Sequence, residues 1–178
     1  GTPSGADFVA VSCGGYHSLA LREDGSLVSW GWNNYGQVDE TPSGSFVSIG
    51  AGNTHSLAVR ADGSLVSWGN DSYGQVSGIP GTTGFVAVAG GNLHSIALTE
   101  SGSLVSWGYD GFGQVTATPS GDDFTAVSAG GNHSAALRAD GSLISWGFDS
   151  FDQVSATPSG TGFFAVSAGG NHSLAIRE

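Results

Sequence analysis

Residues 14–37 read GGYHSLALREDGSLVSWGWNNYGQ, and most of this stretch recurs three more times along the 178-residue chain. A histidine lies in every copy, and the intervals between successive histidines are 38, 39, 39 and 39 residues. A Phe precedes each histidine by nine residues, and a Trp-Gly pair begins thirteen residues after each of the first four histidines. A period near 39 residues is typical of supersecondary units that stack, because none of them can bury its apolar face alone.

The period divides residues 1–178 into a single repeat array in which each unit begins at the recurrent Phe. The repeats span 8–45, 46–84, 85–123 and 124–162, and a half repeat follows at 163–178. The first seven residues match the end of a repeat, and the chain has neither an N-terminal Met nor a signal peptide. We therefore expect a processed chain or an excerpt, with apolar faces at both ends of an open array.

Each repeat has the pattern of short antiparallel strands. In the first copy, segment 17–22 alternates in polarity, Asp24-Gly25 follows, and a Val- and Trp-containing segment comes next at 26–31. The Asp-Gly pair predicts a hairpin with a type I′ turn, in which both central residues have positive φ. A strand that begins at the Phe and a short Gly-Gln-Val strand at 36–38 complete the unit. Because no apolar period of 3.6 residues is present, we expect an all-β fold of four-stranded antiparallel β-propeller blades, as a partial ring or part of an oligomeric or longer propeller.

The pattern GGxHSLALxxDGxLxxWGxNxxGQ, present at 14–37, resembles the repeat of the regulator of chromosome condensation family. The resemblance covers essentially the whole chain, and the compact unit is most similar to the short bacterial repeats of the propeller-type β-lactamase inhibitory protein. It implies a propeller, usually of seven blades, that acts as a protein-binding platform. Members of the family include a nucleotide-exchange factor for a small GTPase, ubiquitin-ligase modules and an enzyme inhibitor, so the resemblance implies the fold more firmly than the function.

The composition excludes several classes of protein. The chain carries 15 acidic residues against 4 basic ones, all Arg, for a formal net charge of −11. Without Lys or an Arg cluster it lacks the groups that neutralise phosphates, so we expect neither nucleic acid nor a membrane surface as a partner. No apolar run approaches the roughly 20 residues that span a bilayer. The low charged fraction of 11% indicates a surface rich in Ser, Thr and Asn, which favours an extracellular or cell-surface location.

Positions that never change between repeats are interpreted as structural. One histidine per blade cannot supply the three or four ligands that a zinc ion needs, so we expect each imidazole to hydrogen-bond backbone or a neighbouring blade, and no metal. The recurrent Trp residues are expected to pack between blades, and the recurrent Gln residues to satisfy loop backbone groups. Cys13 is expected to be a small buried residue. The structural His and Trp residues are His17, His55, His94, His133, His172, Trp30, Trp68, Trp107 and Trp146.

The segments between the third and fourth expected strands vary most, and we call them the c–d loops: 32–35, 70–73, 109–112 and 148–151. They combine rigid aromatic residues with Asn, Asp, Ser and Gly, which is the chemistry of an antibody-like paratope. Loops at the same stage of every blade emerge on one face, so we expect a continuous arc for a partner. We expect exposure at Trp32, Tyr109 and Phe148, whereas the aromatics that close each loop suit covering a neighbouring loop equally well. The partner-binding candidates are Trp32, Asn33, Tyr35, Asp71, Tyr73, Tyr109, Asp110, Phe112, Phe148, Asp149 and Phe151.

The sequence shows no catalytic residues and implies no cofactor, because no Ser–His–acid set or carboxylate pair stands out beyond the repeat itself. We expect a non-enzymatic protein-binding platform that uses the c–d loop face of the propeller. Two alternatives stay open. The open blade ends could drive self-association into an oligomer or filament, and aromatic loops with Asn and Asp also suit glycans.

Overall fold

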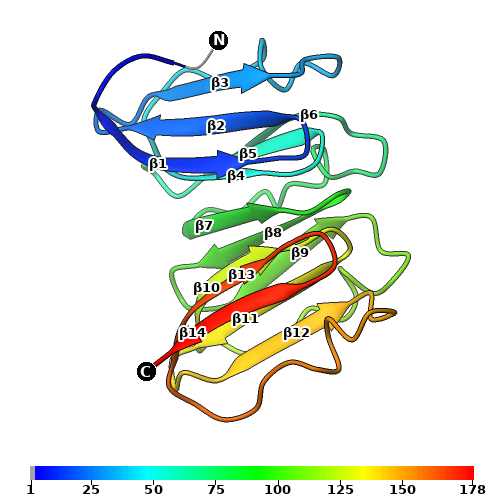
Figure 1. The fold of residues 1–178 in the computed structure, drawn as a ribbon. Helices are drawn as coiled ribbons and strands as arrows, with labels where there is room; N and C mark the ends of the chain where they lie inside the picture. The colour runs from blue at the N-terminus through cyan, green and yellow to red at the C-terminus, as the bar shows by residue number, and fades with distance from the viewer. Residues whose placement is uncertain (1–2) are drawn as a thin grey trace.

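The computed structural model describes residues 3–178 as fourteen strands in five antiparallel sheets (Figure 1). Four sheets have three strands, with the middle strand paired to both neighbours, and the fifth has two. None of these residues forms a helix long and apolar enough to cross a membrane. The strands are β1 (Phe8–Cys13), β2 (His17–Arg22), β3 (Leu27–Gly31), β4 (Phe46–Ala51), β5 (His55–Arg60), β6 (Leu65–Gly69), β7 (Phe85–Gly90), β8 (His94–Thr99), β9 (Leu104–Gly108), β10 (Phe124–Ala129), β11 (His133–Arg138), β12 (Leu143–Gly147), β13 (Phe163–Ala168) and β14 (Ser173–Arg177).

The five sheets follow one another around a common axis. The first strand of each sheet contacts the first strand of the next, and each second strand also contacts the following first strand. The turns that join first and second strands in all five sheets line one open hollow of about 210 Å³. Figure 1 shows the first sheet at the top of the molecule and the last sheet, β13 and β14, in its lower half, in front of the fourth sheet. The expected all-β propeller architecture is thus confirmed, with four full repeats and a partial one.

The Asp-Gly hairpins form as predicted, but the type I′ geometry is wrong. The Gly25 N–H donates to the Arg22 carbonyl at 3.0 Å, and the Arg22 N–H donates to the Ser26 carbonyl at 3.0 Å. Gly25 has a φ of 82°, whereas Asp152 is the one non-glycine residue with positive φ among residues 3–178. The loop therefore holds a third residue and places only its glycine in the left-handed region, a hairpin type that Asp-Gly suits equally well.

The fourth expected strand of each blade is a helical turn instead. In the second repeat the Gly78 N–H donates to the Gly74 carbonyl at 2.9 Å. The Asp71 carboxylate accepts from the N–H groups of Val76 and Ser77 at 2.8 and 2.9 Å. Because these groups are satisfied locally, the segment has no need to pair with the third strand.

The core lies between successive sheets. Between the second and third sheets, Leu57, Val59, Phe85, Val88 and Trp107 form one buried cluster. Equivalent clusters fill the spaces before and after it. A fully buried side chain of this kind stabilises the fold by about 1.5–3 kcal/mol, so each sheet depends on its neighbours for most of its stability.

The two terminal sheets expose apolar side chains because one face of each lies uncovered. Val11 on β1 is 69% exposed, and Leu174 and Ile176 on β14 are 65% and 56% exposed. Cys13, expected to be buried, is exposed for the same reason. At the C-terminal end an open cavity of about 260 Å³ lies between β14 and the fourth c–d loop.

Candidate functional site

The c–d loops are held rigid by side chains from the recurrent positions. In the fourth loop the Asp149 carboxylate accepts from the N–H groups of Val154 and Ser155 at 2.7 and 2.9 Å. These backbone donors, of which the Ser155 N–H contributes most, hold the pKa of Asp149 below its ordinary value, and the side chain therefore stays charged. The Gln153 side-chain oxygen accepts from the Phe151 N–H at 2.9 Å. Side-chain bonds of the same kind fix the other three loops, with Asn33 in the Asp position of the first.

The rings of the second, third and fourth loops form one continuous line, which we call the aromatic row. Adjacent centroids lie 4.7–6.0 Å apart with interplanar angles of 59–74°, so the contacts are tilted or edge-to-face. The ring that closes one loop contacts the first ring of the next loop, which carries the line from blade to blade. The row consists of Tyr73, Tyr109, Phe112, Phe148 and Phe151.

Exposure along the loops runs opposite to the expected order. The aromatics that close the loops are 45–64% exposed, and they are Tyr35, Tyr73, Phe112 and Phe151. Of the first-position aromatics, Trp32 is exposed by 36%, whereas Tyr109 and Phe148 are half-buried. Tyr109 and Phe148 each lie between two closing rings, and these neighbours cover them.

The first loop forms a separate cluster with a residue that sequence reasoning missed. Trp32 contacts Tyr35 at 5.3 Å and Tyr16 at 5.4 Å between centroids, and Tyr16 is 63% exposed. Tyr16 precedes the recurrent histidine, a position at which the other repeats carry Thr, Leu or Asn. That variation beside an invariant residue is the signal that could have identified it.

Asn70 separates this first cluster from the aromatic row. It occupies the first position of the second loop, where the other loops have Trp32, Tyr109 or Phe148. Its side chain is buried, and its oxygen accepts from the Ser72 N–H at 3.1 Å and from the Gln75 amide at 3.0 Å. The second loop therefore lacks the ring that would connect the two aromatic groups.

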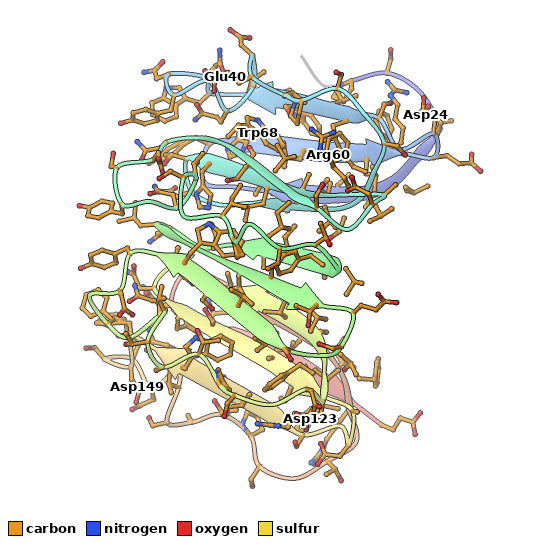
Figure 2. All side chains as sticks on the ribbon, turned by 180° about the vertical axis from the view of Figure 1, so that it is seen from behind. Asp24, Glu40, Arg60, Trp68, Asp123 and Asp149 are labelled. Atoms are coloured by element: carbon orange, nitrogen blue, oxygen red, sulfur yellow. The ribbon has the colours of Figure 1, made fainter. Side chains whose placement is uncertain are left out.

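The c–d loop face carries negative charge and no arginine. Three strands end with Arg beside an Asp-Gly hairpin. The hairpin precedes the third strand of its sheet and the c–d loop follows that strand, so these arginines lie at the other end of the sheet from the c–d loops. Figure 2 shows Glu40 and Asp149 towards one edge of the molecule and Asp24 and Asp123 towards the other. Six carboxylates lie in the c–d loops or in the turns that follow them: Asp39, Glu40, Asp71, Asp110, Asp149 and Asp152.

The recurrent His, Trp and Gln residues join neighbouring blades beneath this face. The His55 ring nitrogen Nε2 lies 3.0 Å from the Ser95 hydroxyl of the next repeat. The Trp107 indole N–H and the Ser95 hydroxyl both donate to the Gln75 main-chain carbonyl, at 2.9 and 3.1 Å. Burial lowers the pKa of His55 to about 3 and that of His94 to about 4. Equivalent His–Ser pairs are His17–Ser56, His94–Ser134 and His133–Ser173.

These histidines therefore remain neutral near pH 7 and link blades. In the part of the chain that the structure describes, no group of three or more His, Cys, Asp or Glu residues is arranged to hold a metal ion.

Known proteins with similar structures share this architecture. Human WBSCR16 superposes with a TM-score of 0.83 at 21% identity, over 96% of this chain and 58% of that one. Prp20p of Saccharomyces cerevisiae superposes with a TM-score of 0.78 at 22% identity, over 96% of this chain and 55% of that one. The chain thus spans little more than half the length of these proteins, and at such identities the likeness concerns the fold.

Sequence relatives match over single repeats. The mitochondrial RCC1 domain-containing protein RUG3 of Arabidopsis thaliana is 50% identical over 34 residues, which are 19% of this chain and 8% of that protein. RCC1 domain-containing protein 1 of Mus musculus is 42% identical over 43 residues, which are 24% of this chain and 11% of that protein. The regulator of chromosome condensation (RCC1) repeat itself matches residues 8–37, 46–75, 85–114 and 124–153, most of the chain. This chain belongs to the RCC1 repeat family.

Proposed function

We propose that this chain is a non-enzymatic protein-binding platform that uses its c–d loop face. The aromatic row carries the proposal: five rings from three blades form one partly exposed line on loops whose backbone is fixed by side-chain hydrogen bonds. Rigid aromatic residues supply large contact areas at a low cost in conformational entropy, and they dominate the energetics of protein interfaces.

Similar proteins support a protein as the class of partner. Prp20p, with the same fold, is described together with its binding properties to Gsp1p and histones. A second structure of Prp20p, described as yeast RCC1, is a complex with Kap60. The resemblance to the β-lactamase inhibitory protein would also place aromatic loop contacts at this face. The identity of the partner does not transfer, because the identities are 20–22%.

The test compares proteins retained by the chain and by two double variants. Tyr109→Ala with Phe112→Ala removes the centre of the aromatic row. The matched control is Val47→Ala with Val86→Ala, two exposed apolar residues beside the Asp-Gly hairpins. We expect a partner identified by mass spectrometry to lose about tenfold or more in affinity for the row variant and less than twofold for the control. Equal retention by both variants, or retention of a glycan on an array in place of any protein, would contradict the proposal.

A second candidate function is self-association, and the exposed faces of the terminal sheets favour it. Val11 at one end and Leu174 and Ile176 at the other offer apolar surface that interior sheets cover with a neighbour. A contact between unlike ends could extend into a ring or a filament. Light scattering at several concentrations tests this candidate, and a compact monomer throughout would exclude it.

A further inference from the structure

The charges around the aromatic row identify the chemistry of the partner. We propose that the segment bound along the row is cationic and places Arg or Lys side chains over its exposed rings. This inference rests on the proposed function and adds the class of partner. It begins from the distribution of arginine: six carboxylates and no arginine belong to the c–d loops and the turns that follow them, whereas all four arginines lie elsewhere.

The chain's own arginines show which contacts its rings can make. Each of the four arginines lies over a Phe ring at the start of its sheet, at 4.5–5.7 Å from guanidinium carbon to ring centroid. Two of these arginines also pair with a carboxylate, Arg22 with Asp7 and Arg138 with Asp123, each at 2.6 Å. A cation between a ring face and a carboxylate is therefore a recurrent arrangement in this protein.

The aromatic row has the same two components without a cation. Each of its three loops contains a carboxylate within two residues of a ring in the sequence. All four arginines of the chain are already engaged with Phe rings elsewhere. Asp71, Asp110 and Asp149 use Oδ1 to hold their loops, which leaves Oδ2 for an incoming donor. Backbone N–H donors keep the pKa of Asp110 and Asp149 low, so both carboxylates stay charged.

The blade-to-blade repetition of ring and carboxylate also indicates an extended segment. Each c–d loop from the second to the fourth supplies an Asp and a closing aromatic, and ring contacts connect these loops. A bound chain with cationic side chains at intervals could meet one such pair per blade. The complementary potential would speed association and would disfavour acidic partners.

A peptide with three copies of Arg-Gly-Gly is the probe, and the same peptide with citrulline in place of Arg is its control, since citrulline keeps the shape and removes the charge. We expect the Arg peptide to bind by fluorescence anisotropy and to perturb the amide resonances of Tyr73, Phe112 and Phe151. Citrulline should weaken binding at least tenfold. Raising the salt from about 50 to 200 mM should weaken it severalfold, because exposed charges are screened within about 10 Å.

The decisive variants change three carboxylates on each edge of the molecule. Asp71→Asn, Asp110→Asn and Asp149→Asn together remove charge from the c–d loops. Asn33 makes the same two backbone bonds in the first loop, so the amide preserves the loop. The matched control combines Asp24→Asn, Asp62→Asn and Asp140→Asn beside the hairpins.

We expect the c–d loop variant to bind the Arg peptide about tenfold more weakly and the hairpin variant to stay within twofold. Equal weakening in both variants would show attraction to net charge alone and would overturn the inference. Absence of Arg-peptide binding would also overturn it, and the proposed function would still stand if the Tyr109→Ala and Phe112→Ala variant lost a protein partner. Absence of any row-dependent partner would overturn both.

Discussion

The second c–d loop begins with Asn70 where the third and fourth begin with an aromatic residue, and this difference shows two uses of the same backbone. In the second loop Asn70 accepts from the Gln75 side-chain amide. In the fourth loop Phe148 stands there instead, and the corresponding Gln153 amide nitrogen is buried without a partner. The aromatic residue thus gains ring contacts and exposes binding surface, while it leaves a buried donor unsatisfied. The residue at the first loop position thus determines whether the buried Gln amide is satisfied or the loop adds an aromatic ring to the binding surface.

Acidification should have the largest effect on stability, because protonation of the buried histidines disrupts the His–Ser contacts that join the blades beneath all the c–d loops. The pKa of His55 is lowered to about 3 and that of His94 to about 4, against an ordinary value of 6.5. Below pH 6.5 the unfolded chain binds protons that the folded chain does not, so stability falls as the pH falls. At pH 5 each histidine should account for about 2 kcal/mol of lost stability.

Urea unfolding between pH 7.5 and 4.5 measures this loss. His94→Gln should make the pH dependence shallower, because it removes one of the two imidazoles whose pKa burial lowers most. If different repeats unfolded at different pH values, the buried histidines would not act on one cooperative unit, and the prediction would be wrong.

Asn70→Tyr should give the second loop the first-position aromatic residue that the third loop has in Tyr109. The change removes two hydrogen bonds from the Asn70 oxygen and should cost about 1–2 kcal/mol in the free energy of unfolding. It should also bring a ring against Tyr35, which a double-mutant cycle with Tyr35→Ala would detect as a coupling of about 0.5–1 kcal/mol.

Asn34→Tyr is the matched control, because Asn34 is exposed in the first loop. It should change stability by less than about 0.5 kcal/mol. Zero coupling between the substitutions at positions 70 and 35 would mean that Asn70 is not what interrupts the line of rings.

The smallest effect should come from Asp152→Gly, directly after the fourth loop. Asp152 has a φ of 59°, whereas the first three loops are followed by Gly36, Gly74 and Gly113 with φ of 77–78°. Glycine adopts this region without the steric cost of a Cβ, so the substitution should stabilise the protein by roughly 0.5–1 kcal/mol. The reciprocal Gly113→Asp should destabilise it by a similar amount, and thermal melts of both variants provide the measurement.

The repeat period predicted most of the fold, since Phe, His, Trp and Gly recur at positions that become strand starts and turns. Two local features could not be read from the sequence. Asp-Gly suits two hairpin types, and Asp24 distinguishes them, because it lacks the positive φ that a type I′ turn requires at both central residues. Gly-Gln-Val looks like a strand, but the side chain of Asp71 binds the backbone that a strand would need.

The candidate surface was predictable in its location and not in its detail. Variation among the c–d loops located the aromatic residues, but their contacts depend on how far one blade lies from the next. That spacing is set by the packing of Trp107 and its counterparts between sheets, which a list of loop residues does not contain. The burial of Tyr109 between two other rings follows from the same spacing.

The His–Ser–Gln contacts between blades have a direction. Since the Ser95 hydroxyl donates to the Gln75 carbonyl, its oxygen is left to accept from His55, which fixes that imidazole as the Nε2–H tautomer. Every interior junction can repeat this donor-to-acceptor order. Each interior repeat therefore presents its histidine to the next repeat and its serine to the previous one. Duplicating residues 85–123 in tandem would then insert a blade without a new interface and lengthen the aromatic row by two rings. The reach of the binding surface is thus a modular quantity, counted in whole repeats.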